Sequence, residues 1–283
     1  LDRLKVMSSR RRVFRGRRHR SQLTGTAPAV ELLEDRTLLT YTASLTGMIA
    51  TIGGDGAGDT LELSTDGGNL KHNRFTAGDG GFNSDIDWDT SVAGDQTIAV
   101  ANVTYLTADA GDGNDTINLN ALDFDSIGVM VDIDGGLGTD VININGAVSV
   151  DGGTPDMQLE AETIADAAAL DVDGELTLEA GAGNSITLDQ AGNDFGSVVI
   201  TSALNVTLVD ANTLEFGTSS VSGNLDATAT TGNVTDSGVA TVGGTASFTA
   251  ANANDDIVVD QLAVTGSVDV QTNGATGDAT VVN

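Results

Sequence analysis

The sequence predicts an all-β protein, a right-handed parallel β-solenoid preceded by a disordered basic N-terminal segment. Three observations predict this fold class. Past residue 41, short runs of β-prone residues alternate with Gly, Asn and Asp, and in the second half their centres lie roughly 6 to 12 residues apart. Aromatic residues make up only 4% of the chain, so the apolar content is mainly Val, Ile, Leu and Ala, which suits a narrow core. Similar segments also recur along the chain, as they do in solenoids.

Residues 1–40 form a separate basic segment. They hold 10 of the 12 Lys and Arg residues and 4 of the 41 acidic residues, a net charge of +6. Their core, "SSRRRVFRGRRHR" (Ser8–Arg20), has no apolar period, so we expect it to be disordered. It is either a solvated tail or an export signal, although the apolar region of a twin-arginine signal does not follow it. We expect an export or targeting segment.

Residues 41–283 are strongly acidic. They keep 2 basic and 37 acidic residues, a net charge of −35 within a chain of −29. Such a polyanion repels nucleic acid and anionic membranes, so we expect neither as a partner. No run of 18 apolar residues is present, so we expect no transmembrane helix. The absence of cysteine excludes disulfides and thiol chemistry and is compatible with secretion.

The strand-rich region divides into residues 41–150, with Gly/Asp turns, and residues 151–283, with more degenerate repeats. "MQLEAETIADAAAL" (Met157–Leu170) has no clear apolar stripe, so it is one helical turn or more solenoid. "LTLEAGAGNSITLDQ" (176–190) aligns with "ASFTAANANDDIVVDQ" (246–261), an offset that three coils would explain. A β-sandwich is the alternative fold, but its wide core needs more large side chains.

Two stretches resemble known surface proteins. "ELLEDRTLL" (Glu31–Leu39) is similar to the N-terminal motif of large planctomycete surface proteins, where it precedes extracellular repeats. "VTDSGVATVGGTASFTA" (234–250) resembles the degenerate repeats of filamentous-haemagglutinin-like proteins. These resemblances imply an extracellular or cell-surface location. The sequence stops on "ATVVN", a strand without a polar cap, so we expect a longer protein with further repeats beyond Asn283.

Three glycine-rich turns resemble the calcium-binding repeat of RTX, or haemolysin-type, proteins, G-G-x-G-x-D-x-U-x with U a large apolar residue. "GGLGTDVIN" (135–143) matches every position, "AGDGNDTIN" (110–118) all but the first, and "GGDGAGDTLE" (53–62) after one insertion. The resemblance implies calcium as cofactor, anchored by these carboxylates: Asp59, Asp115 and Asp140. It implies further ligands from these carbonyl groups: Gly111, Gly113, Gly136 and Gly138.

The spacing of the three aspartates indicates how calcium would be shared. A calcium ion takes six to eight oxygens, more than one loop offers, so two stacked loops must share it. Asp115 and Asp140 are 25 residues apart, about one coil, and Asp59 lies 56 residues before Asp115, close to two coils. Stacked carboxylates about 4.8 Å apart repel unless a cation lies between them. The alternative is that these are tight turns, where Gly, Asn and Asp are common in any case. Downstream, Ser185 and Asn254 stand near the expected aspartate position.

Two other clusters of charged residues are weaker candidates for a functional site. "SDIDWDTSVAGDQ" (84–96) resembles an EF-hand loop but lacks its Gly and Glu, so we expect a strand with three acids on one face and Trp88 on the other. "NLKHNR" (69–74) would supply the basic residues of a calcium-dependent polysaccharide lyase. However, one short basic cluster among 37 acidic residues makes a poor cationic groove for an acidic polymer. The alternative is a turn whose cations pair with nearby acids.

The sequence therefore favours a secreted or cell-surface structural or adhesive solenoid that is stabilised by calcium and is not an enzyme. Its expected partners are glycan or protein surfaces of the cell envelope or extracellular matrix. A passive calcium-binding module and a carbohydrate-active β-helix are the alternatives.

Overall fold

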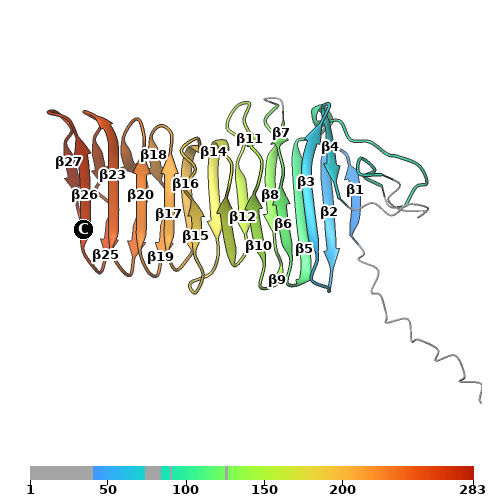
Figure 1. Cartoon of the computed structure of the whole chain (residues 1–283), viewed down its shortest axis with the longest axis horizontal. Coiled ribbons are helices and arrows are strands. Elements are labelled where there is room, and N and C mark those ends of the chain that lie inside the picture. The colour runs from blue at the N-terminus through green and yellow to red at the C-terminus, as the bar shows by residue number, and fades with distance from the viewer. Residues whose placement is uncertain (1–40, 74–83, 90, 125–126) are drawn as a thin grey trace, which may run out of the picture. The chain divides into compact units, whose positions relative to one another are not determined.

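The computed structural model describes residues 41–73, 84–89, 91–124 and 127–283, and these belong to one compact unit. The expected basic segment, residues 1–40, lies outside the described residues, as does Arg74. The described chain is an all-β parallel solenoid of about eight turns, which confirms the predicted fold class. Figure 1 shows the strands side by side, with coil following coil in chain order.

Three sheets form the solenoid. The path of the 14-stranded first sheet is β1 (Thr42–Thr46), β2 (Ile49–Asp55), β5 (Tyr105–Gly113), β8 (Met130–Asp134), β12 (Met157–Glu160), β14 (Leu170–Glu179), β16 (Asp194–Ser202), β18 (Leu214–Phe216), β21 (Val234–Asp236), β24 (Ile257–Val259) and β27 (Ala279–Val281). Beside this path lie β7 (Leu122–Asp123), β9 (Leu137–Gly138) and β11 (Val148–Val150).

The second sheet has ten strands: β4 (Asn69–His72), β3 (Thr60–Asp66), β6 (Thr116–Leu119), β10 (Val141–Ile144), β13 (Thr163–Asp166), β15 (Ile186–Leu188), β17 (Val206–Asp210), β20 (Leu225–Ala229), β23 (Ala246–Ala253) and β26 (Val268–Asn273). The third sheet contains β19 (Ser219–Val221), β22 (Ala240–Val242) and β25 (Leu262–Val264). A 3₁₀ turn, η1 (Val100–Asn102), precedes β5.

The core is a set of aliphatic columns. Along β6 and β10, for example, buried positions alternate with more accessible ones, because successive side chains of a strand point to opposite faces. Parallel register then places equivalent residues on top of one another: Leu61, Ile117 and Ile142 are paired in turn and fully buried. Further along the solenoid, the rings of Phe216 and Phe248 pack edge to face in the core, with 6.2 Å between their centroids.

The N-terminal end of the solenoid is closed by antiparallel strands. β1 folds back on β2, and β4 folds back on β3. Between β4 and β5 the chain makes an excursion that buries Trp88, whose indole Nε1–H donates to the carbonyl of Leu70 at 3.0 Å. This excursion corrects the estimate of two coils between Asp59 and Asp115: β3 pairs directly with β6, so one enlarged coil separates them.

Two further expectations change with the strand positions. Residues 157–170 are more solenoid rather than a helix, because they contain β12, β13 and the start of β14. The predicted repeat between residues 176–190 and 246–261 is wrong, because the two segments are not equivalent parts of a coil. The first leads from the first sheet to the second, and the other leads from the second sheet to the first. Both sheets share one alternating pattern, so sequence similarity does not distinguish them. Within the described residues, no helix is long and apolar enough to span a membrane.

Candidate metal centre

The three predicted anchor carboxylates form one column at a corner of the solenoid. Asp59, Asp115 and Asp140 each precede a strand of the second sheet, and the residues that follow them are paired: Thr60 with Thr116, and Thr116 with Val141. Their exposed fractions are 7%, 1% and 1%. The expected stacking of Asp115 and Asp140 is therefore confirmed. The column is buried rather than solvated.

Backbone N–H groups lie between successive carboxylates of this column. Asp115 Oδ1 accepts the N–H of Asp59 at 2.6 Å, and Asp140 Oδ1 accepts the N–H of Asp115 at 2.7 Å. Glu162 continues the column, because its Oε2 accepts the N–H of Asp140 at 2.8 Å. Such hydrogen bonds favour the charged form of a buried carboxyl group. We name Asp59, Asp115, Asp140 and Glu162 the corner column.

Glu162 lies outside any glycine-rich repeat, so the calcium-binding motif does not predict it. The strand register identifies Glu162. Thr163 pairs with Val141, so Glu162, the residue before Thr163, occupies the position of Asp140 one coil later. In the next coil this position is Asn184, since Ile164 pairs with Ile186. The expected substitute Ser185 is therefore one residue out of place.

The glycines of the motif bring neighbouring coils close together. A Cβ atom on Gly136 would collide with the carbonyl oxygen of Gly111, and one on Gly138 with that of Gly113. Gly111, Gly113 and Gly136 also have positive φ angles of 89°, 143° and 84°, which favour glycine. Close backbone packing thus explains these glycines without an ion, and it sets their carbonyl oxygens against the next coil.

A second set of carboxylates lies on the outward face beside this corner. Asp109, Asp134, Glu160 and Glu179 occupy one register position on β5, β8, β12 and β14. We name these four residues the outer column. Burial raises the pKa of Glu160, and the negative charges of Asp134 and Glu179 raise it further. The four residues belong to separate strands with no shared motif, so the sequence alone does not predict that they align.

The two columns meet around Asp140. Burial raises the pKa of Asp140, although the N–H of Asp115 opposes this, and Glu162 and Asp134 add negative potential. Among the described residues, no group of three or more His, Cys, Asp or Glu side chains is arranged to hold a metal ion. The carboxylates lie in rows along the solenoid rather than around a point. The side chains of Asp140 and Glu162 interact directly, and this contact contributes to the raised pKa of Asp140.

The predicted acidic strand at residues 84–96 is wrong. Its described residues are irregular, and both Asp87 and Trp88 are buried. Asp87 Oδ1 accepts the N–H groups of Asp89 and Gln96, so it stabilises a turn. The indole ring of Trp88 is buried, and this holds the segment against the end of the core. Alternation of polar and apolar residues in the sequence does not predict such packing.

Of the cationic cluster, Asn69–His72 form strand β4 rather than a turn. Lys71, on β4, forms ion pairs with Asp85 at 2.7 Å and Asp66 at 3.5 Å, as the pairing alternative predicted. His72 is buried, and its Nε2 lies 2.6 Å from the carbonyl oxygen of Asp87. These contacts bind the excursion to β3 and β4.

Comparison with known proteins gives one family match. A family model described as repeats of unknown function matches residues 112–202 and 203–261, which together exceed half of the chain. The matched segments cover the coils from the second glycine-rich turn to β24. Neither the curated proteins nor the solved structures contain a match. The chain belongs to the family of repeats of unknown function (DUF5649).

Proposed function

We propose that this chain is a structural or adhesive β-solenoid, secreted or displayed on the cell surface, and stabilised by calcium. The observation that carries the proposal is the regular outward array of polar side chains on consecutive parallel strands, of which the outer column is one part. Extended solenoid surfaces serve as binding platforms because each coil adds an equivalent position to the same face. The partners are glycan or protein surfaces of the cell envelope or matrix.

The extracellular assignment rests on composition. A chain without cysteine needs no oxidative folding, and a polyanion of −35 past residue 40 stays soluble and repels nucleic acid and anionic membranes. The resemblance of "ELLEDRTLL" to surface-protein motifs supports the same location.

The calcium part of the proposal rests on the pair Asp140 and Glu162. Two facing carboxyl groups in a buried corner are stabilised either by a shared proton or by a cation. Calcium accepts carboxylates from two neighbouring coils, and extracellular sites of this kind bind at about 10⁻⁴ to 10⁻³ M. Calcium outside the cell would therefore neutralise this pair. The outer-column members Asp134 and Glu160 add negative potential to the same corner.

We also propose that the chain is not an enzyme. In a lyase, Lys71 would be the available base, but it is held between two carboxylates, which favour its charged form. Burial opposes this effect, yet Asp85 and Asp66 raise the pKa of Lys71 overall. A protonated lysine cannot abstract a proton. Incubation with polygalacturonate should release no unsaturated uronate, whereas release by the wild type but not by Lys71→Ala would contradict this assignment.

Labelling of intact cells tests the location. Antibodies raised against residues 41–283 should label unpermeabilised source cells, and external protease should remove the signal. An antibody against a cytoplasmic protein controls for cell integrity. Labelling that requires permeabilisation would contradict a surface role, provided that the culture medium also lacks the protein.

A further inference from the structure

Tyr105 is the one aromatic side chain that is not buried among the residues that the structure describes. The other described aromatic residues are at most 2% exposed, and they fill the core or the N-terminal end. Tyr105 begins β5 and points outward from the first sheet. An outward aromatic ring in a chain with so few aromatics needs an explanation other than core packing.

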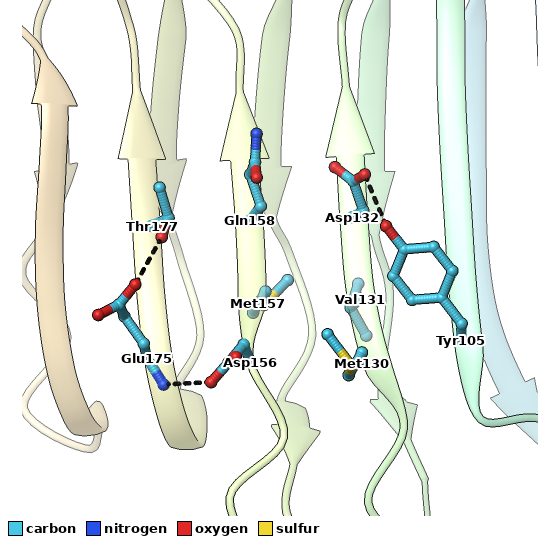
Figure 2. Close-up of a pocket in the computed structure, with 9 residues that line it drawn as sticks. All are labelled: Tyr105, Met130, Val131, Asp132, Asp156, Met157, Gln158, Glu175 and Thr177. Carbon is cyan, nitrogen blue, oxygen red and sulfur yellow. Dashed lines mark hydrogen bonds between the residues drawn. The ribbon is translucent and has the colours of Figure 1, made fainter.

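The Tyr105 ring lies flat along the sheet and is fixed there. Its hydroxyl donates to Asp132 Oδ2 at 2.9 Å, and Figure 2 shows the ring face-on, spanning from β5 toward β8. Burial and the hydrogen bond to Asp132 raise the pKa of Tyr105, so the phenol keeps its proton and remains a donor. The ring is partly exposed and lines a surface hollow, where it offers a platform.

Apolar neighbours extend this platform along the solenoid. Ile49, Tyr105 and Met130 occupy one register position on β2, β5 and β8. Ile49 and Met130 are 43% and 45% exposed. With about 4.8 Å between strands, the three side chains form a short apolar strip that crosses the strands.

The same face carries a shallow hollow, which Tyr105 and Met130 line at one side and hydrogen-bonding groups line at the other. Asp132, Asp156, Gln158 and Glu175 line it, together with Thr177 (Figure 2). Asp156 Oδ1 accepts the N–H of Glu175 at 2.9 Å, and the Thr177 hydroxyl lies 3.4 Å from Glu175 Oε1. Neighbouring strands therefore hold these acceptors in fixed positions next to the apolar strip.

We propose that this hollow, from Tyr105 to Thr177 on the first sheet, binds a neutral glycan chain that runs across the strands. The inference deepens the adhesive function proposed above and rests on it. Carboxylates and the Gln158 carbonyl accept hydrogen bonds from sugar hydroxyls, and the Tyr105 ring receives the apolar face of a sugar. A recognition site of this kind combines apolar surface with a few placed polar groups.

The charges of the hollow decide which glycans fit. Asp132, Asp156 and Glu175 repel carboxylated or sulfated polymers, so polyanionic glycans are excluded. A polycation would be attracted by acidic residues along the whole chain and would gain little from this one position. The aromatic platform favours a ligand with an apolar ring face, and neutral sugars supply one without a repelling charge.

Affinity electrophoresis of the full chain tests the proposal. Native gels are cast with neutral galactan, mannan, xyloglucan or mixed-linkage glucan, and parallel gels with polygalacturonate or chitosan oligosaccharides. At least one neutral polysaccharide should retard the wild type, polygalacturonate should not, and Tyr105→Ala should weaken the affinity by about tenfold or more. Tyr105→Phe, which keeps the ring but loses the bond to Asp132, should fall between the two.

Val258→Ala is the matched control, because Val258 is 38% exposed on β24 of the same sheet, far from the hollow. Circular dichroism of each variant separates lost binding from lost fold. No retardation by any neutral polysaccharide, equal retardation of Tyr105→Ala, or retardation by chitosan alone would overturn the glycan site. Surface labelling of cells would be unaffected by those results, so the failure of this inference differs from failure of the proposed function.

Discussion

At the scale of single residues, two kinds of contact hold the coils together at the corner column. In one, a carboxylate accepts a backbone N–H of the preceding coil; in the other, a glycine lets two backbones approach closely. The first is shown by Asp115 and the second by Gly138. Both contacts connect coils rather than residues within a turn. Substitution at either should therefore loosen the stacking of coils.

Gly138→Ala tests the close approach. The added Cβ would collide with the carbonyl oxygen of Gly113, so two coils must separate locally. We expect a loss of about 1–3 kcal/mol in the free energy of unfolding, measured by urea denaturation. Gly183→Ala is the control, because no atom lies within 4 Å of its added Cβ. Equal midpoints for the two variants would contradict this role.

Asp115→Ala tests the carboxylate contact. It removes the acceptor of the Asp59 N–H, and a buried N–H left without an acceptor costs about 1–3 kcal/mol. Asp115→Asn keeps a carbonyl oxygen at this position and should lose less stability in urea denaturation. A larger loss for Asn than for Ala would contradict the hydrogen-bonding role.

At the scale of strands, parallel register turns scattered acids into columns. The outer column places Asp109, Asp134, Glu160 and Glu179 on adjacent strands. Like charges that face each other across strands destabilise a sheet. The outer column therefore costs stability, which agrees with a role in binding rather than in folding.

Glu160→Gln should stabilise the chain at pH 8 and low salt. The change removes a charge between Asp134 and Glu179, and we expect a gain of about 0.2–1 kcal/mol in the free energy of unfolding. The gain should shrink in 1 M NaCl, because salt screens exposed charges. Glu215→Gln is the control, because Glu215 pairs with Thr235. A gain of the same size in the control would show that the column is not its source.

The sequence predicts the positions of these strands well, but it predicts less well which strands lie next to one another. Alternation in "TINL" and "VINI" places Ile117 and Ile142 in the core because strand periodicity is a local property. The register between coils depends on how many residues each coil contains. From its length alone, the segment between β4 and β5 cannot be distinguished from an extra coil. For the same reason, Glu162 and the outer column could not be predicted, whereas the stacking of Asp115 and Asp140 could.

Across the whole molecule, stability should increase as the pH falls from 8 toward 5. Burial raises the pKa of Asp210 to about 7, although the N–H groups of Asn212 and Phe195 oppose the shift. Burial also raises the pKa values of Asp140, Glu160 and Asp171. Because its pKa is raised in the folded state, Asp210 stabilises the fold below its unfolded value of 3.8, and this contribution is lost as the pH rises through about 7.

Urea denaturation at several pH values measures this dependence. The midpoint should be higher at pH 5 than at pH 8, and Asp210→Asn should reduce the difference. The exposed Asp226→Asn is the control. A midpoint that falls steadily from pH 8 to pH 5 would contradict the inferred protonation of buried carboxyl groups.

The most direct test of a calcium-stabilised extracellular solenoid is thermal unfolding of the full chain at pH 7.5 and low salt, followed by far-ultraviolet circular dichroism in chelator and in millimolar calcium. A site filled at one hundred times its dissociation constant adds about 2.7 kcal/mol, so the melting temperature should rise with calcium. Magnesium should do less, because it prefers octahedral geometry and keeps its waters. Asp140→Asn with Glu162→Gln should abolish the response, and Asp226→Asn should preserve it. A melting temperature that is the same in chelator and in calcium would contradict the account.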